Sequence, residues 1–527
     1  MSGADSQGGQ FVLSRRKLFI SAGAVVAGSA VAGCAGGSGG GGSGSSLGLR
    51  YGEAGAFSTF NPWAQSLNQL STANQMFSRL VAKTQDGEAV ADVAEDWELA
   101  PDGLSISITL RSGVKWHDGE DLVADDIVTM YGYLTDPEVE ADAGVQKIKE
   151  LFAPVTGVTA TDESTVEMTF SSPVPYALDL LNYWYILRLD DPADTSFIEH
   201  FPTGTGPYKM TAFTQESASF EGFADYYEPD LPKVDKFRFD IFAEGSNLVS
   251  SLQAGQIDGA LVSNYAQVES LQGDEGYYIE QVRLGVWLLM VNASKPPFDN
   301  LAVRQALSWS MNREEFANAG NFGLEDPVTS PFFTDAATGY VEDLVRAQWF
   351  DLDMAASLLD SAGVSGLTIN YPYPTSFPNF GTYGEIWQAD LATIGVTLTL
   401  EPVSQGRWGE IGSGEEADVT DVVPWQVGRC LQDGAVFFAA NSGYRGAEQR
   451  FGFENAELEG LVAQGQAETD QEKRIQIYQD LNQLVVDQCT NISFATYSET
   501  FCWSKKVEGP GYDLAGNLRV SGVELTT

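Results

Sequence analysis

The stretch that most constrains the fold lies near the middle of the chain, at residues 287–316. It opens within an apolar run, residues 286–291, whose length suits one buried strand. Two prolines, a lysine and an aspartate then interrupt the pattern at residues 292–300, which favours an exposed turn. The chain is therefore expected to place a buried strand and a tight turn at its centre.

A helix is predicted directly after this turn. Asp299 or Asn300 can cap it, because both side chains accept hydrogen bonds from free main-chain amides. From Leu301 to Met311 the apolar residues recur at helical spacing, and residues 312–314 are predicted to close a polar face. Strands are also predicted at 105–110 and 166–170, and a helix at 386–393. This alternation of helix and strand along the chain predicts a mixed α/β fold.

Length and charge restrict the class of protein. A chain of 527 residues is too long for one ordinary core, so two or three domains are expected. Its 73 acidic and 29 basic residues give a formal net charge of −44. Nucleic acid is excluded as a partner because its binding relies on Lys and Arg. Acidic residues spread along the whole chain favour a halophilic protein, with an ordinary acidic secreted protein as the alternative.

The amino terminus has the features of an export signal. Arg15 and Arg16 precede a weakly apolar run that ends near residue 33, too short and glycine-rich for a stable membrane span. Paired arginines are typical of twin-arginine signals, although Leu18 and Phe19 stand in inverted order here. Residues 1–33 are therefore predicted to be a signal peptide that is removed.

A candidate lipidation site follows the signal. Residues 31–34 read Val-Ala-Gly-Cys, similar to a lipobox, which predicts lipidation of Cys34. The alternative is a processed signal with an incidental cysteine. Residues 34–46 are almost entirely Gly and Ser after the cysteine, as in a flexible tether. This pattern indicates a protein anchored to the outer face of the cell membrane, working in solute capture, adhesion or exported catalysis.

Motifs for cofactor chemistry are scarce. The glycine-rich turn at 204–208 lacks the Lys-Ser/Thr ending of a phosphate loop, which argues against nucleotide binding there. Only two histidines, His117 and His200, are present, which argues against a histidine-based metal or acid–base centre. No cofactor and no metal are expected.

Several motifs along the chain, taken in order, resemble one family. They are AEDWELAPDGLSISITLRSGVKWHDGEDLVADDI, TGTGPYKM, AGQIDGA, NASKPPFDNLAVRQALSWSMNREE, LLDSAG and ADLATIGVTL. Their order resembles the extracellular solute-binding proteins of the peptide/nickel (oligopeptide/dipeptide-binding) class, which feed ABC importers. The resemblance extends from about residue 50 to about residue 510, and the ordered set is more specific than any single motif.

The resemblance implies a two-lobed α/β fold of the periplasmic-binding-protein type, class II, with a hinged cleft. The first lobe is expected to hold residues 47–285 and 491–527, including an extra subdomain at about 64–200. The second lobe is expected at 286–490. In this class the lobes close over a ligand, and the closed form is recognised by the importer's membrane subunits. A monomer is expected.

The family also implies where a ligand binds. In its peptide binders, a loop containing a tryptophan presents an aspartate to the amino terminus of the peptide. Trp425 matches that tryptophan, but Gly428 stands at the position of the aspartate and Arg429 follows it. Glycine offers no side-chain acceptor, which puts ordinary short-peptide binding in doubt. Asp433 could substitute for the missing carboxylate, and Arg429 could hold a carboxylate or phosphate or simply be solvated.

Aromatic residues are further candidates for the cleft wall. Trp408 matches another tryptophan of the family's pocket, and Tyr183, Trp184, Tyr185 and Tyr497 lie where the family's chain passes the cleft. Aromatic faces suit sugar rings, peptide side chains and flat organic ligands alike. Core packing is the alternative for each of them.

The remaining cysteines and His117 have less specific patterns. Cys489 and Cys502 flank an alternating segment and could pair, which would leave Cys430 free; alternatively Cys430 pairs with one of them. His117 lies in a loop motif of the family, where a structural role is favoured over a ligand role.

The leading hypothesis is a membrane-tethered protein that binds a peptide or a peptide-sized polar organic solute for an ABC importer. An oligosaccharide or a nickel chelate are the alternative ligands. An exported hydrolase is the alternative of another class, against which the chain shows no Gly-x-Ser-x-Gly elbow and no usable catalytic histidine. A structural surface protein would not need the motif set. The chain is therefore expected not to be an enzyme.

Overall fold

The computed structural model describes residues 48–55, 62, 67–135, 148–188, 203–242, 245–428, 433–438, 451 and 453–526. Residues 47–527 fold as one unit. The predicted signal and tether with Cys34, the predicted ligand residue Arg429, and Cys430 lie outside the described residues. Within these ranges, no helix has the length and apolar character needed to cross a membrane.

The largest sheet among the described residues has eight strands in the spatial order β15-β12-β16-β11-β1-β10-β9-β8. Its strands are β1 (Leu49–Ala54), β8 (Tyr208–Thr214), β9 (Ser217–Gly222), β10 (Lys236–Phe242), β11 (Gly259–Leu261), β12 (Tyr277–Val291), β15 (Val422–Val427) and β16 (Asn491–Ser504). Strand β1 pairs in parallel with β10 and β11, whereas β12 pairs antiparallel with both β15 and β16. The sheet is therefore mixed.

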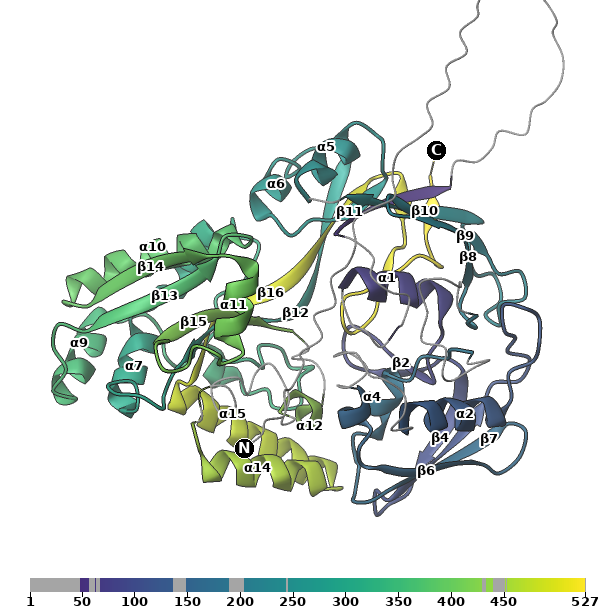
Figure 1. Ribbon diagram of the computed structural model, residues 1–527, viewed down its shortest axis with the longest axis horizontal. Helices are drawn as coiled ribbons and strands as arrows, with labels where there is room; N and C mark the ends of the chain where they lie inside the picture. The colour runs from purple at the N-terminus through teal and green to yellow at the C-terminus, as the bar shows by residue number, and fades with distance from the viewer. Residues whose placement is uncertain are drawn as a thin grey trace, which may run out of the picture. The chain divides into compact units, whose positions relative to one another are not determined.

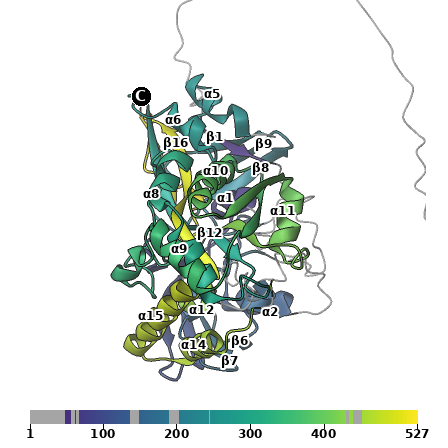
Figure 2. The same cartoon turned by 90° about the vertical axis from the view of Figure 1, so that its left-hand side faces the viewer.

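Strands β12 and β16 lie side by side over most of their length (Figures 1 and 2). Their pairing runs from Tyr277 opposite Ser504 to Met290 opposite Asn491. The strand predicted at 286–291 is confirmed, but it begins much earlier. Residues 277–281 are only half-buried, so they lack the continuous apolar run that marks a buried strand in a sequence.

Two large hydrophobic cores share these two strands. The first core includes Leu284 on β12 and Phe501 on β16. The second core includes β12 from Val286 onward and β16 as far as Ala495. The side chain of Tyr497 packs against both cores. We call the residues around the first core the first lobe and those around the second core the second lobe. A smaller cluster lies between the helices Leu248–Gln253 and Tyr265–Glu269 and the face of β16 that carries Cys502.

The first lobe contains a second sheet, with the strand order β4-β5-β7-β6. Strand β5 shows why its sequence forms a strand, because Ile106, Ile108 and Leu110 are buried while Ser107 between them is exposed. The strands predicted at 105–110 and 166–170 are confirmed. The elements of this lobe not yet named are α1 (Leu67–Met76), β2 (Val81–Lys83), β3 (Ala89–Ala91), β4 (Ala94–Leu99), β5 (Ser105–Leu110), α2 (Ala124–Thr135), β6 (Val155–Ala160), β7 (Thr165–Phe170), α4 (Ala177–Asn182), η1 (Gly245–Asn247), α5 (Leu248–Gln253), α6 (Tyr265–Glu269), β17 (Val507–Glu508), β18 (Gly511–Tyr512), β19 (Leu518–Arg519) and β20 (Glu524–Leu525).

The second lobe packs helices against β15 and the parallel pair β13–β14, with α10 and α11 beside these strands in Figure 1. Helix α10 confirms the helix predicted at 386–393 but starts at Pro378, which occupies its first turn. The elements not yet named are α7 (Leu301–Trp309), α8 (Arg313–Glu315), η2 (Phe316–Gly320), η3 (Glu342–Arg346), α9 (Leu352–Ser361), β13 (Thr368–Pro374), α10 (Pro378–Thr393), β14 (Thr397–Val403), α11 (Gln405–Gly412), α12 (Gly434–Phe437), α14 (Ala456–Ala467) and α15 (Gln471–Gln488).

The central helix α7 begins as predicted and ends earlier than expected. Its cap is Asn300, whose side chain accepts a hydrogen bond from the Ala302 amide. The predicted polar face at 312–314 is wrong for Arg313, which is 1% exposed. Its guanidinium donates to the carbonyls of Ser308 and Gln348 and, from β16, of Ser493. Arginine is therefore a buried cross-link at this position.

The proposed pairing of Cys489 with Cys502 is wrong, because both are free thiols. Strand β16 is continuous between them, so the segment does not return on itself as a hairpin would. Cys489 lies in the second core and Cys502 in the small cluster at the far end of the strand. Burial raises the pKa of each thiol to about 12, which keeps them protonated near neutral pH.

Candidate functional site

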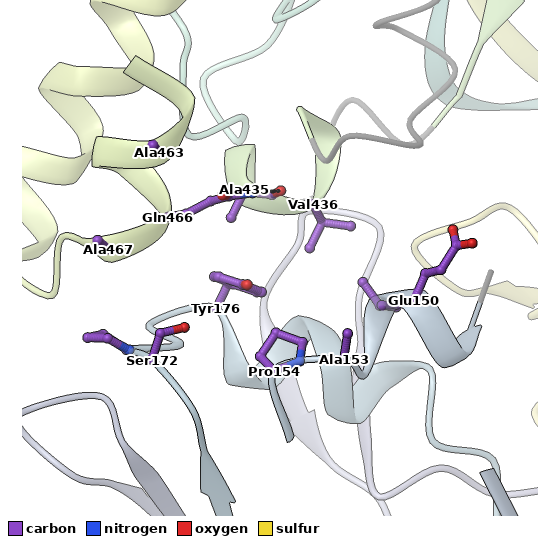
Figure 3. A pocket seen from close by; sticks show the side chains of 12 residues that line it. Glu150, Ala153, Pro154, Ser172, Tyr176, Ala435, Val436, Ala463, Gln466 and Ala467 are labelled. Atoms are coloured by element: carbon purple, nitrogen blue, oxygen red, sulfur yellow. Dashed lines mark hydrogen bonds between the residues drawn. The ribbon is translucent and has the colours of Figure 1, made fainter. Parts of the chain in front are cut away.

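The two lobes face each other across a pocket of about 550 Å³ (Figure 3). The first lobe contributes Leu151, Pro154 and Tyr176, and the second lobe contributes Ala435 and Val436 from α12 together with side chains of α14. Figure 3 shows Ala435 and Val436 facing Tyr176 and Pro154 across the opening. Most of these side chains are apolar, so the pocket suits an uncharged part of a ligand.

Two more polar pockets lie along the same boundary. One, of about 730 Å³, is lined by Gln85 and Asp86 of the first lobe, by Gln281 and Arg283 of β12, and by residues 333–336, 340, 345 and 346 of the second lobe. The other, of about 360 Å³, shares Asp335, Ala336 and Tyr340 with it and extends to Asp433 and Arg474. Volumes of this size suit small organic solutes.

A network of four charged side chains crosses from one lobe to the other. In the first lobe, Lys83 Nζ on β2 donates to Asp179 Oδ1 on α4 at 2.9 Å. The same Asp179 oxygen accepts a hydrogen bond from the Asp433 main-chain amide of the second lobe at 3.3 Å. The Asp433 carboxylate is ion-paired with Arg474 of α15. All four side chains are buried or nearly so, and each buried charge therefore depends on its partner of opposite charge.

Tyr176 completes this contact from the first lobe. The Arg474 guanidinium lies 6.0 Å from the centre of the Tyr176 ring, at the limit of a cation–π contact. Burial raises the pKa of Asp179, and the Asp433 charge raises it further, while Lys83 opposes the change. Lys83, Asp179 and Arg474 had no sequence signal, because they are isolated residues brought together from three distant segments.

Asp433 therefore lies at the lobe boundary, as a cleft residue would. Its side chain also caps α12 by accepting a hydrogen bond from the Ala435 amide at 2.8 Å. Helix capping and the ion pair with Arg474 occupy one carboxylate oxygen, Oδ1. The proposed contact between Asp433 and a ligand stays a prediction.

Trp408 and Trp425 form a stacked aromatic pair in the second lobe. Their ring centroids are 4.0 Å apart, and Trp408 Nε1 donates to the Pro424 carbonyl of β15. Gly412 makes room for this arrangement, because a Cβ at that position would lie 2.1 Å from the Trp425 ring. Trp408 is 5% exposed, while Trp425 is half-buried. Of the pair, Trp425 is therefore better placed to reach a solute.

Gly428 follows β15 and faces open space. A Cβ added there would have Leu284 Cβ, at 4.0 Å, as its nearest neighbour. By contrast, a Cβ at Gly285 would lie 1.8 Å from the Val427 carbonyl oxygen. The end of β15 thus approaches β12 closely at Gly285 while leaving room at Gly428.

The aromatic run at 183–185 lies in the first-lobe core. Trp184 is 0% exposed and makes an edge contact with Phe152, while the Tyr185 hydroxyl accepts a hydrogen bond from Arg79 at 2.7 Å. Tyr183 is 8% exposed at the end of α4. The alternative of core packing describes where these three residues lie, and their contact with a ligand stays a prediction.

Tyr497 occupies the crossing between the cores. It lies opposite Gly285 of β12 and makes an edge contact with Trp287, at 4.9 Å between centroids. Its hydroxyl donates to Glu499 Oε1 at 2.6 Å. Sequence reasoning missed Glu499, although it is the one acidic residue in the segment 491–504 and so was a usable signal.

His117 packs within the first lobe. Its Nε2 lies 3.0 Å from the Gly206 carbonyl oxygen, and its ring makes an edge contact with Phe223. Burial lowers its pKa to about 4, so the imidazole is neutral at physiological pH. Among the described residues, no group of three His, Cys, Asp or Glu side chains is arranged to hold a metal ion.

Two cores joined by a pair of continuous strands, with pockets and buried charges at their boundary, define a two-lobed solute-binding fold. The chain belongs to the bacterial extracellular solute-binding proteins, family 5, whose middle region matches residues 88–427. The expected α/β fold and the solute-binding class are confirmed.

Known proteins resemble the chain over most of its length. It is 25% identical over 516 residues to the dipeptide-binding protein of Escherichia coli (strain K12), covering 90% of this chain and 94% of that protein. The structure of HbpA2 from Haemophilus parasuis superposes with a TM-score of 0.78 at 23% identity, covering 91% of this chain and 100% of that one. NikZ from Campylobacter jejuni, in complex with Ni(L-His), superposes with a TM-score of 0.74 at 21% identity, covering 89% and 97%.

Proposed function

We propose that this protein captures a peptide or a peptide-sized polar organic solute between its lobes and delivers it to an ABC importer. The observation that carries the proposal is the pair of strands β12 and β16, which pass from one core to the other beside pockets lined by both lobes. Such a connection permits hinge closure over a solute. The similarity to a dipeptide-binding protein supports the ligand class.

The lobes taken to move are residues 47–285 with 491–527, and residues 286–490. Within the cleft, Trp425 supplies an aromatic face, and Trp408 supports it from behind. Arg429 would bind an acidic group of the solute. A nickel chelate is the second candidate because NikZ, a structural neighbour, holds Ni(L-His). The presence of only two histidines in the chain makes it the weaker one.

Outside the cell, the protein is proposed to be held at the membrane through lipid on Cys34 after export by the twin-arginine route. The motifs at the amino terminus and the Gly/Ser tether support this proposal. Its work is capture and release without chemical change, as a monomer in a salty medium. The acidic composition supports the last point.

Thermal unfolding of the purified protein in high salt tests the ligand class. Pools of short peptides, oligosaccharides and nickel–histidine are added separately, and a bound solute raises the melting temperature by mass action. We expect the peptide pool to give the largest increase. Chemical change of the solute, or a larger response to another pool, would contradict the proposal.

Trp425→Ala tests the placement of the cleft. The substitution removes an aromatic face, so solute affinity should fall about tenfold or more while the fold persists. Trp97→Ala is the matched control, because Trp97 is also a half-buried tryptophan but lies on β4 of the first lobe. Equal affinities of the two variants would place the solute elsewhere. Arg429→Ala is expected to weaken binding of acidic solutes selectively.

A further inference from the structure

Glu53 and Tyr51 of β1 carry polar atoms that are buried without partners. Glu53 is 1% exposed and Tyr51 is 0% exposed. Neither Glu53 Oε2 nor the Tyr51 hydroxyl has a hydrogen-bond partner among the described residues. Because β1 side chains alternate, these two lie on the same face of the sheet. Two unsatisfied polar groups together on one buried face are unusual in a protein interior.

Glu499 of β16 lies close to this pair. Tyr51 and Trp503 are in contact, with ring centroids 5.3 Å apart, across the side-chain-free Gly259 of β11. Glu53 and Glu499 follow on the same sheet face. In the described part of the chain, neither of them forms an ion pair with a lysine or an arginine. Burial raises the pKa of both carboxyls, and the charge of Glu499 raises that of Glu53 further.

Two other buried carboxyls among the described residues are satisfied. Glu325 accepts four hydrogen bonds, from the Tyr265, Thr496 and Ser498 hydroxyls and from the Ser498 amide. Asp513 is ion-paired with Arg79. Glu53 Oε2 therefore differs from these two carboxyls in lacking a donor, and among the described residues Glu499 accepts from the Tyr497 hydroxyl alone.

The acidic pair is connected to the hinge through Tyr497. Tyr497 donates to Glu499, packs against both cores and lies opposite Gly285. Gly285 in turn is in close contact with the chain at Val427 and Gly428. The pair thus lies on the first-lobe side of the crossing, near the position where Gly428 leaves the second lobe without a carboxylate.

We propose that Glu53 and Glu499 bind the cationic group of the solute, an ammonium or a guanidinium. This inference rests on the proposed function and names the chemistry that the solute must carry. A positively charged donor satisfies both carboxylates at once, and the Tyr51 hydroxyl adds a further acceptor.

A peptide pool offered in two forms tests the inference. The purified protein is mixed with a pool of short peptides bearing free amines and, separately, with the same pool after acetylation of every amine. Retained peptides are identified by mass spectrometry. We expect the native protein to retain the free-amine pool about 10- to 100-fold more strongly, as the loss of a charge-assisted hydrogen bond implies. Glu53→Gln and Glu499→Gln should each lose this preference.

A matched control separates a binding role from a structural one. At pH 8, Glu53→Gln and Glu499→Gln should keep or raise the melting temperature of the solute-free protein, because each removes a buried carboxyl that is poorly hydrogen-bonded. Glu325→Gln should lower it, because that carboxyl is fully hydrogen-bonded. If the first two variants lower it as Glu325→Gln does, the pair is structural and the inference is wrong.

The remaining outcomes are also decisive. If acetylated peptides are retained as strongly as free ones, the inference fails and the proposed function stands. If the variants retain free-amine peptides as the native protein does, the cationic group binds elsewhere and the inference fails alone. If no pool of peptides, sugars or nickel–histidine is retained, the proposed function and the inference fail together.

Discussion

The Asp433 main-chain amide of the second lobe donates a hydrogen bond to the Asp179 carboxylate of the first lobe, at 3.3 Å. Two acidic residues meet at this contact, and each is balanced by a cation from its own lobe, Lys83 for Asp179 and Arg474 for Asp433. At this contact the lobes therefore meet through alternating charges. Removing one cation leaves an unbalanced carboxylate at the boundary.

Arg474→Ala is expected to lower the free energy of unfolding by about 3 to 5 kcal/mol, because it leaves the buried Asp433 carboxylate without its ion pair. Lys473→Ala, one residue earlier on α15, is the matched control. Its side chain is 69% exposed and its pair with Asp470 is a surface contact, so a change below about 1 kcal/mol is expected. Denaturant titration measures both values, and similar losses in the two variants would contradict the structural role of the network.

Glu325 should make stability depend on pH. Burial raises its pKa to about 7, against the hydrogen bonds that it accepts. The folded protein holds this proton more tightly than the unfolded chain, so the stabilisation is complete below the ordinary glutamate pKa and is lost as the pH rises through 7. The expected contribution is about 3 kcal/mol between pH 4 and pH 8. Native protein and Glu325→Gln, unfolded across this range, should differ in slope; parallel curves would refute the assignment.

Arg313→Ala is expected to destabilise the second lobe strongly. The guanidinium donates to carbonyls of Ser308, Gln348 and Ser493, and all three would lose a donor in the core. A loss of about 3 kcal/mol or more is expected. Arg346→Ala provides the comparison, because Arg346 is exposed and should change stability by less than about 0.5 kcal/mol. Calorimetric melting of both variants decides the point.

Gly285 and Gly428 should respond oppositely to an added side chain. Gly285→Ala places a Cβ 1.8 Å from the Val427 carbonyl oxygen, so β12 and β15 must separate and the melting temperature should fall. Gly428→Ala meets its nearest neighbour at 4.0 Å and should melt with the native protein. Gly428→Asp should in addition strengthen binding of free-amine peptides. Failure of Gly428→Ala to fold would show that the open space is not available.

Much of the fold was predictable because periodic patterns report burial. The strand at 105–110 alternates cleanly, and the helix at 301 has a cap and an apolar stripe. The early part of β12 was missed because half-buried strands carry no continuous apolar run. Arg313 was predicted on a polar face because a charged side chain at the end of a helix is ordinarily exposed to solvent. Here its guanidinium is buried and donates hydrogen bonds to three carbonyl groups instead.

The site was predictable only where neighbouring residues share a motif. Trp408 and Trp425 come from a recognisable segment and do form a pair. Lys83, Asp179 and Arg474 meet through the packing of separate elements, which no local pattern reports. Trp184 was predicted for the cleft wall because of its place in the sequence, but its ring packs against Phe152 in the core. Hydrophobic bulk alone does not separate a core residue from a binding residue.

The shared strands have a consequence for the order in which the chain is made. The first core needs Phe501 and Trp503 from β16, and the second needs Ile492 and Phe494 from the same strand. Neither core can be completed until β16 (Asn491–Ser504) has left the ribosome. Final folding of both lobes therefore waits for β16, and a chain truncated before this strand would have no lobe able to mature alone.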